Sequence, residues 1–439
     1  MSFKSDFLWG AASAAAQFEG AYLDGGRTPS IWDDPAVLKD NIAHGETPHE
    51  ACDHYHRFKE DIELMRSLGL KSYRFSVSWS RVMPHKGQVN PQGISFYREL
   101  VETLRSAGIE PIVTLYHWDL PLWVHEEGGW ENEQVVKWFC EYVSCVVDAL
   151  SDMVTWWITF NEMQMFIGRG YISGINAPFL KTQDPGRIAN LTRNVMLSHG
   201  EAVKIIRKHG KSPAKIGMAP TGPVYTPLSE TEEDINKAYD ATFAIMPGAE
   251  GASWWMDPIV LGKLPEQLKP YISGEDLKII CQPLDFYGFN VYQSRNYSEA
   301  AGRNPAVYPG MPRTAFNWPI TPEVMYWSVR FHYERYRLPV MITENGMANT
   351  DFVMEDGKVH DPQRTDFIFR YLKSLKRAAD EGFPVLGYQY WALMDNFEWA
   401  EGYDKRFGLI YVDYRTQKRT VKDSAWSYKE IIESNGENL

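Results

Sequence analysis

Two short apolar segments of this chain each run into a glutamate that has an asparagine beside it. Residues 339–346 read PVMITENG, and residues 156–162 read WWITFNE. An apolar run of this length that stops at a turn is typical of a buried parallel strand. Because parallel strands end at the same edge of their sheet, the pattern predicts that Glu344 and Glu162 lie close together.

A repeated unit accounts for much of the rest of the chain: an amphipathic helix, a glycine and then a short apolar strand. Tyr55, Phe58, Ile62 and Met65, for example, share one helical face before Gly69 and the next strand. Repeated units of this kind predict a parallel sheet. Eight strands are predicted, at residues 7–10, 73–77, 111–116, 155–161, 215–220, 285–292, 340–344 and 385–393.

Eight strands in a chain of 439 residues with no linker predict an α/β fold, a single (β/α)₈ TIM barrel with long βα loops over residues 1–439. A doubly wound sheet is the alternative. Polar segments that contain Gly and Pro, at residues 24–50, 300–322 and 348–362, are predicted to be the long loops. In a barrel, such loops determine specificity.

The charge balance and the apolar pattern restrict the partners. A net charge of −12 disfavours binding to nucleic acid or to an anionic membrane. Uncharged apolar runs fall short of the roughly 18 residues that a membrane span needs. The first residues lack the apolar region of a signal peptide, so a cytoplasmic location is expected.

Motifs for a metal or a cofactor are not found, and none is expected. The four cysteines are scattered without metal-site or CxxC spacing, which favours reduced thiols. His54 and His56 are two positions apart, so on a helix they point to different sides. The sequence also lacks GxGxxG and GxxxxGK phosphate loops and the GxSxG nucleophile motif.

The two glutamates are the candidate catalytic pair. Hydrolysis of an acetal needs a proton on the leaving oxygen and a nucleophile or a water on the opposite face of the sugar. A single glutamate after a strand is as often a helix cap or a loop carboxylate. Two such positions, each with a neighbouring asparagine, favour catalysis by Glu162 and Glu344.

Arg74 and His117 are candidates for supporting roles. Arg74 is a charge inside an apolar strand, so it must be paired. It is either a structural ion pair or the group that holds Glu344 ionised. His117 and Trp118 follow a predicted strand, which favours contact with a ligand over plain packing, and Asp119 is expected to orient the imidazole.

Aromatic and polar residues near other strand ends are candidates for sugar binding. The aromatic content of 14% includes 16 Trp, and pyranose C–H faces stack on such rings. Trp391 ends the last predicted strand, and Glu398 and Trp399 lie in the loop after it. Gln17 follows the first strand, where its amide could bind adjacent hydroxyls. For Trp391 and Glu398, the alternative is that the tryptophan packs in the core and the glutamate is solvated.

Taken together, these segments resemble the family 1 glycoside hydrolases, the retaining β-glucosidases and β-galactosidases, over nearly the whole chain. Any one of the motifs alone would be weak, but the set is specific. The matching motifs are FLWGAA (7–12), QFEG (17–20), YRFS (73–76), YHWDLP (116–121), TFNE (159–162), ITENG (342–346) and DNFEW (395–399).

The resemblance implies a role for each candidate residue. Glu162 would be the acid/base and Glu344 the nucleophile of a double displacement on terminal β-D-glucosyl residues, with β-galactosides, β-fucosides and cello-oligosaccharides as further substrates. Tyr292 would hydrogen-bond the nucleophile. The residues that would grip the sugar hydroxyls are Gln17, His117, Asn161, Glu398 and Trp399; Trp391 would stack beneath the sugar, and Trp318 would lie on the aglycone side.

The chain departs from the family pattern at Met163, where proline usually follows the acid/base glutamate. The carboxylate is unchanged, so catalysis is expected to survive, and the substitution bears on loop geometry and aglycone preference. Relatives that hydrolyse 6-phosphosugars carry a serine and a basic cluster where this chain has Glu398 and Trp399. Unphosphorylated sugars are therefore favoured over 6-phospho-β-glucosides.

Two other functions use the same barrel. A non-catalytic sugar-binding barrel would lack one of the two glutamates, and both are present here. A transglycosylating β-glycosidase needs the same residues and differs only in whether water or a sugar accepts the glycosyl group. The sequence leaves open this choice, the preference among gluco-, galacto- and fuco-substrates, and the possibility of a homo-oligomer.

Overall fold

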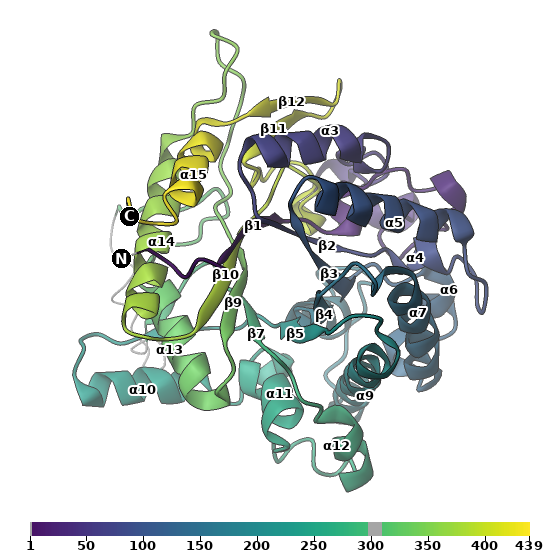
Figure 1. The fold of residues 1–439 in the computed structure, drawn as a ribbon. Helices are drawn as coiled ribbons and strands as arrows, with labels where there is room; N and C mark the ends of the chain where they lie inside the picture. The colour runs from purple at the N-terminus through teal and green to yellow at the C-terminus, as the bar shows by residue number, and fades with distance from the viewer. Residues whose placement is uncertain (1, 297–309) are drawn as a thin grey trace.

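The computed structural model describes residues 2–296 and 310–439 and has an eight-stranded parallel sheet at its centre, with helices around it (Figure 1). The strand order is β5-β4-β3-β2-β1-β10-β9-β7. The strands are β1 (Leu8–Ala12), β2 (Ser72–Ser76), β3 (Glu110–Tyr116), β4 (Trp156–Asn161), β5 (Lys215–Ala219), β7 (Tyr287–Asn290), β9 (Val340–Asn345) and β10 (Val385–Trp391). All eight predicted strands are therefore confirmed, with ends that differ by up to two residues.

Backbone hydrogen bonds join the two edge strands and close the sheet. The amide of Asp285 donates to the carbonyl of Ile216 at 2.8 Å, and the amide of Asn290 donates to the carbonyl of Pro220 at 3.0 Å. The result is the predicted (β/α)₈ barrel, and the doubly wound alternative is wrong. Closure removes the unpaired strand edges that an open sheet would expose.

Helices connect consecutive barrel strands and cover the outside of the barrel. The longer ones are α3 (His54–Ser67), α5 (Pro91–Ser106), α7 (Gln134–Leu150), α9 (Pro185–His209), α10 (Glu232–Thr242), α13 (Val324–Tyr336), α14 (Pro362–Asp380) and α15 (Asp423–Glu433). The shorter ones are α1 (Ala15–Phe18), α2 (Pro35–Leu38), α4 (Trp79–Val82), α6 (Leu122–Glu126), α8 (Met163–Ile167), α11 (Ala252–Met256) and α12 (Gly274–Ile280).

Helix α5 illustrates how local sequence sets these elements. The side chain of Asn90 accepts a hydrogen bond from the amide of Gln92, and Pro91 occupies the first turn, where no intrahelical donor is needed. The apolar side chains that recur at helical spacing are buried against the barrel: Phe96, Tyr97, Leu100, Val101 and Leu104. The predicted amphipathic pattern thus marks the face that packs on the strands.

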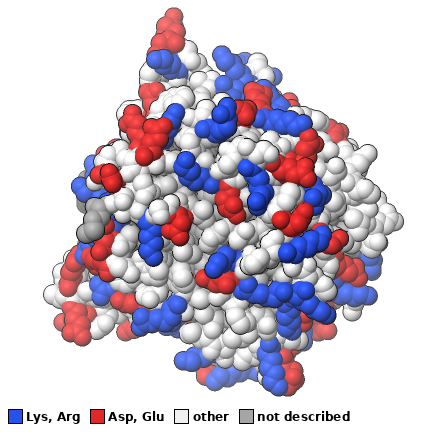
Figure 2. Space-filling model, in the orientation of Figure 1, with Lys and Arg blue, Asp and Glu red and all other residues white. Residues whose placement is uncertain are grey.

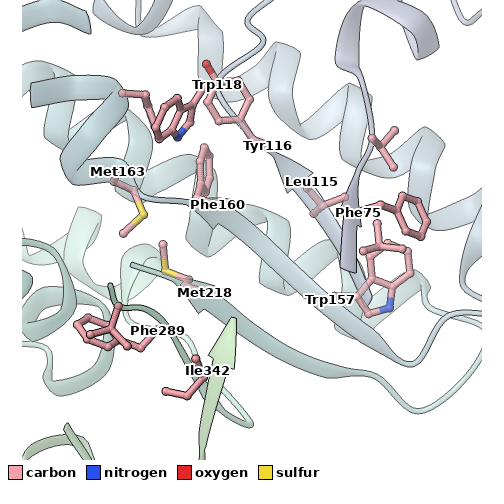
Figure 3. Packing of buried hydrophobic residues seen from close by; sticks show 14 of the residues in the cluster. Phe75, Leu115, Tyr116, Trp118, Trp157, Phe160, Met163, Met218, Phe289 and Ile342 are labelled. Carbon is pink, nitrogen blue, oxygen red and sulfur yellow. The ribbon is translucent and has the colours of Figure 1, made fainter. Parts of the chain in front are cut away.

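The core of the described residues has three parts, of which one is a small cluster around Trp391. The largest part fills the space between strands and helices, where Leu115, Phe160 and Ile342 pack among other buried side chains (Figure 3). A smaller cluster lies inside the barrel and includes Ile112, Ile158 and Met341, which come early in their strands. This cluster fills the N-terminal end of the barrel, so the polar residues that come later in the strands rest on a dry apolar layer.

Outside the barrel, the described chain forms long loops and two small β-ribbons. Residues 24–50 contain only short helical turns and α2, in agreement with the predicted loop. Of the predicted loop at 300–322, residues 300–309 lie outside the described residues. Two small ribbons are added, β6 (Tyr225–Thr226) with β8 (Arg295–Asn296) and β11 (Ile410–Asp413) with β12 (Lys418–Val421). The N-terminal segment meets the C-terminal one through the amide of Phe3, which donates to Asn435.

The surface carries both signs of charge. On the face shown in Figure 2, Lys and Arg alternate with Asp and Glu, without a large region of one sign. The described part of the chain contains no helix both long and apolar enough to cross a membrane. All four cysteines are free thiols, as predicted.

The closure of the barrel depends on a glycine, which gives a test of the fold. A Cβ at Gly288 would lie 2.4 Å from the carbonyl oxygen of Met218 on β5 and 2.8 Å from the Thr343 side chain on β9. We expect Gly288→Ala to push these strands apart and to destabilise the protein by about 1–3 kcal/mol. Thermal or denaturant unfolding measures the change.

A matched control is Gly274→Ala at the start of α12, where a Cβ would meet no atom within 4 Å. This change should leave the unfolding midpoint near that of the wild type. Equal midpoints for the two variants would contradict the close approach of β5, β7 and β9 at Gly288.

Candidate active site

Most of the candidate residues meet around one small cavity at the C-terminal edge of the barrel. The cavity has a volume of about 90 Å³, and it is lined by both candidate glutamates. Glu162 directly follows β4, and Glu344 is the last residue but one of β9. The other predicted residues that line it are His117, Trp118, Asn161, Tyr292, Trp318, Trp391, Glu398 and Trp399.

Arg74 lies beneath the cavity and bonds to three other strands. Its side chain is fully buried, and Nη1 donates to Oε1 of Glu344 at 2.6 Å and to the carbonyl of Thr343 at 2.9 Å. Nη2 donates to Oδ1 of Asn161 at 2.5 Å, and Nε donates to Thr114 at 3.1 Å. The predicted charge inside the apolar strand is therefore paired, and its partner is Glu344.

Tyr292 completes the environment of Glu344. Its hydroxyl donates to Oε2 of Glu344 at 2.7 Å, so each oxygen of this carboxylate accepts a strong hydrogen bond. Burial and the neighbouring charge of Glu344 raise the pKa of Tyr292 well above its usual value. The phenol therefore keeps its proton and stays a donor.

Glu162 is held differently. Its backbone has a left-handed φ of 46°, a conformation that non-glycine residues adopt infrequently and that is enriched at functional sites. Its carboxyl contacts an amide rather than a cation: Nδ2 of Asn290 donates to Oε1 at 2.8 Å. Oδ1 of Asn290 in turn accepts from the Thr343 hydroxyl at 2.6 Å, which fixes the orientation of the amide.

These different partners separate the two carboxyls electrostatically. Burial and the nearby Glu344 charge raise the pKa of Glu162 to about 8. Burial also raises the pKa of Glu344, but Arg74 and the Tyr292 hydroxyl oppose this by stabilising the ionised form. At neutral pH one proton is therefore held mainly on Glu162, and Glu344 carries the negative charge.

His117 is neutral and is oriented by Asn161. Burial and the Arg74 charge hold the pKa of His117 well below its usual value. Oδ1 of Asn161 already accepts from Arg74 and from Asn290, so its Nδ2 must be the atom that lies 3.1 Å from Nε2 of His117. Nε2 is then the acceptor, and the ring proton is on Nδ1.

The expectation that Asp119 orients this imidazole is wrong. Asn161 holds one ring nitrogen, and within the described residues Nδ1 of His117 has no hydrogen-bond partner. Trp118, between the two residues, has a φ of 76°, which turns the chain sharply after His117. Adjacent residues in the sequence therefore leave the strand end in different directions.

Gln17 does not line the cavity, but its side chain lies next to Glu398, which does. Nε2 of Gln17 donates to the carbonyl of Phe397 at 2.8 Å and lies 3.5 Å from Oε2 of Glu398. Burial and the Glu344 charge raise the pKa of Glu398 to about 8. Oε1 of Gln17 is buried without a hydrogen-bond partner among the described residues, so it is available as an acceptor.

Aromatic rings form the walls of the cavity. Trp391 lies parallel to the His117 ring, with centroids 5.8 Å apart and an interplanar angle of 21°. Trp399 packs against Trp118 at 4.6 Å. On another side, Trp318 packs against Tyr292 at 5.3 Å. Flat apolar walls around polar groups are typical of carbohydrate and other small-molecule sites.

The sequence pattern did not identify one residue of the site and did not place another. Asn290 was not predicted as a site residue, although it bonds both Glu162 and Asn161. The sequence feature that could have identified Asn290 is its position, as a polar residue near the end of the predicted strand at 285–292. Met163, the departure from the family pattern, is fully buried in the core and does not line the cavity (Figure 3).

Metal ligation finds no support among the described residues, where no three His, Cys, Asp or Glu side chains form a potential metal site. His54 is bonded to Asp61 at 2.7 Å and His56 to Asp53 at 2.6 Å. The cavity itself offers an ionised carboxylate, a protonated carboxyl and a set of hydrogen-bonding groups.

Comparisons with known proteins agree with this geometry. The profile of glycosyl hydrolase family 1 matches residues 1–437. Beta-glucosidase A of Thermotoga maritima is 40% identical over 99% of this chain and 98% of its own length, and beta-glucosidase A of Acetivibrio thermocellus is 40% identical over 99% of both. A solved structure of the Thermotoga maritima beta-glucosidase in complex with glucoimidazole superimposes with a TM-score of 0.89 at 39% identity, covering 99% of both chains.

The coupling between the two carboxyls can be measured without turnover. The negative charge of Glu344 raises the pKa of Glu162, so its removal in Glu344→Gln should lower that pKa from about 8. The retained Arg74 charge acts in the same direction. Carboxyl ¹³C NMR or difference infrared titration follows the Glu162 proton, and an unchanged or higher pKa would contradict the proposed coupling.

Proposed function

This chain belongs to glycosyl hydrolase family 1, and from that membership and its site we propose that it removes terminal β-D-glucosyl residues from β-glucosides with retention of configuration. It is a glycoside hydrolase. The observation that carries the proposal is the contrast between the two carboxyls: Glu344 bonds Arg74 and Tyr292, whereas Glu162 bonds only a neutral amide. A retaining mechanism needs one ionised and one protonated carboxyl.

Glu344 acts as the nucleophile in the first step. Arg74 holds it ionised, and Tyr292 fixes its second oxygen, so the carboxylate attacks the anomeric carbon and forms a covalent glycosyl-enzyme. Glu162 donates its proton to the leaving oxygen as the bond to the aglycone breaks. The raised pKa of Glu162, about 8, supplies that proton at neutral pH.

Glu162 acts as the base in the second step. Once Glu344 is esterified its negative charge is gone, and the pKa of Glu162 falls. Glu162 then accepts a proton from water as the water attacks the anomeric carbon and releases glucose. Retention requires the two carboxyls to be about 5–5.5 Å apart.

The remaining residues bind the glucosyl unit. Oε1 of Gln17 and the Nδ1 proton of His117 have no partner among the described residues and are placed to bond sugar hydroxyls. Asn161, Glu398 and Trp399 add further contacts, Trp391 stacks on the sugar ring, and Trp318 takes the aglycone side. Glu398, protonated or ionised, offers no positive charge to a 6-phosphate, which supports unphosphorylated substrates.

Three further properties are part of the proposal. Residues 1–439 act as one domain, the enzyme works in the cytoplasm, and β-galactosides, β-fucosides and cello-oligosaccharides, as released in cellulose degradation, are also hydrolysed. The names of the relatives support the glucoside, and the open side of the cavity near Trp318 is consistent with an extended substrate.

A panel of p-nitrophenyl β-D-glycosides tests the activity and its stereochemistry. We expect rapid release from the glucoside, with β-glucose as the first product in the NMR spectrum, and glucose from cellobiose. An initial α-product would refute retention. No release from any unphosphorylated glycoside would refute the proposed function.

The roles of the two glutamates are separable by substitution. Glu344→Gly should reduce hydrolysis by about 10⁴-fold or more for every aglycone, with the circular dichroism spectrum unchanged. Glu162→Ala should reduce hydrolysis of glucosides with poor leaving groups far more than that of activated aryl glucosides, because only the former need a proton. Added azide should give the α-glucosyl azide with Glu344→Gly and the β-glucosyl azide with Glu162→Ala. The reverse pattern would exchange the two assignments.

A further inference from the structure

A second hollow adjoins the catalytic cavity on the side of Glu162. It has a volume of about 510 Å³ and shares five lining residues with the cavity: Glu162, Met165, Arg169, Tyr292 and Trp318. Because Glu162 protonates the leaving oxygen in the proposed mechanism, the aglycone must depart on its side. Glu398, Trp391 and Trp399 line only the first cavity, so the second hollow is where the aglycone lies.

Two arginines in this hollow have no partner. Arg169 and Arg295 line it, both are exposed, and within residues 2–296 and 310–439 neither guanidinium forms an ion pair or a hydrogen bond. Every other described arginine bonds a carboxylate or a carbonyl, or, for Arg337, lies over the ring of Tyr333. The two arginines without a partner among the described residues therefore lie in the same hollow.

The backbone fixes the position of both arginines. Arg169 lies in the π-helical turn η4 (Gly168–Ile172), and its carbonyl accepts from the amides of Ile175 at 2.8 Å and Asn176 at 3.1 Å. A Cβ at the next residue, Gly170, would lie 2.8 Å from the carbonyl oxygen of Ala177, so this turn packs closely on its neighbour. The amide of Arg295 donates to Val224 at 2.7 Å, which ties it to the ribbon of β6 and β8.

The rest of the hollow is suited to an aromatic group beside an anion. Its lining includes the ring of Trp318 and the apolar side chains of Met165 and Ile175. Its charged residues are the two arginines, Glu250 and Glu162. With Glu162 protonated in the resting enzyme, the fixed charges sum to one positive charge. The charge of Arg169 also acts on Glu162, whose pKa it lowers, so Arg169 lies within electrostatic reach of the scissile bond.

We propose that Arg169 and Arg295 select β-glucosides whose aglycone is an aromatic carboxylic acid, with the ring on Trp318 and the carboxylate between the two guanidinium groups. This inference rests on the proposed function and specifies its substrate class. Guanidinium groups bind carboxylates through paired hydrogen bonds, which gives both affinity and orientation. Glu250 opposes the preference, because a second carboxylate in the same hollow repels the aglycone.

Two matched substrates isolate the charge: 3-carboxyphenyl β-D-glucoside and its methyl ester. The ratio of kcat/KM for the acid to that for the ester is compared between enzymes, so the difference in leaving group cancels. We expect Arg169→Gln and Arg295→Gln each to lower this ratio about three- to fivefold, the size expected for a partly exposed ion pair. The loss should appear in KM for the acid, because the carboxylate is remote from the reacting bond and is bound equally before and during reaction.

Three further variants separate charge recognition from a structural role. Arg169→Lys keeps the charge and should retain most of the ratio. Glu250→Gln should raise the ratio about two- to threefold, since it removes the repulsion. Arg66→Gln, a loss of the same charge near the end of α3 and at the opposite end of the barrel, should leave the ratio and both activities unchanged. High salt should reduce the wild-type ratio.

The outcomes distinguish this inference from the proposed function. Wild-type hydrolysis of the ester with ratios that Arg169→Gln and Arg295→Gln leave unchanged would refute the inference and keep the β-glucosidase assignment. An equal loss on acid and ester, or a change confined to the pH profile, would give Arg169 a structural or electrostatic role and would also refute it. A wild-type enzyme that cleaves neither substrate would refute the proposed function, and this inference with it.

Discussion

The buried pair of Arg74 and Glu344 is the interaction on which the rest of the site depends. Removing two charges from water is costly, and an ion pair alone does not recover the cost unless the remaining polar atoms are also bonded. Here they are: Thr114, Thr343 and Asn161 take the other donors of Arg74, and Tyr292 takes the second oxygen of Glu344. The pair and its hydrogen bonds therefore join β2 to β3, β4 and β9 at the depth in the barrel where the two candidate carboxyls lie.

The apolar layer below this pair makes its electrostatics effective. Ile112, Ile158 and Met341 fill the N-terminal end of the barrel, so the charges rest on an apolar layer from which water is excluded. In such surroundings a neighbouring charge or donor has a larger effect than it has in water. The same burial that raises the pKa of Glu162 thus also strengthens the effect of the Glu344 charge on that pKa.

The cavity and the adjoining hollow are lined by different kinds of groups. In the proposed binding mode, uncharged amides, an imidazole and flat rings surround the glucosyl unit, and a protonated or weakly ionised Glu398 lies among them. On the aglycone side, exposed arginines lie on a helical turn and a short ribbon outside the barrel. Elements inserted between barrel strands vary without disturbing the sheet, and the proposal accordingly places specificity for the leaving group there and the catalytic groups on the strands.

The sequence by itself determined the elements and the reactive groups. The periodicity of apolar residues located all eight strands, and the runs that end in Asn161-Glu162 and in Glu344-Asn345 identified the carboxyls, because strand ends are set by local pattern. It also required a partner for Arg74, because an unpaired charge in an apolar strand is too costly.

Only the tertiary structure decided which groups meet. Asn290 bonds residues more than a hundred positions away, and it does so because closure of the barrel places β7 next to β5 and so only one strand away from β4. His117 takes Asn161 as its partner rather than the adjacent Asp119, because the chain turns at Trp118. Arg169 and Arg295 share a hollow because two segments outside the barrel fold over the same strand ends. Contacts of this kind follow from sheet closure and loop packing, which a local pattern does not encode.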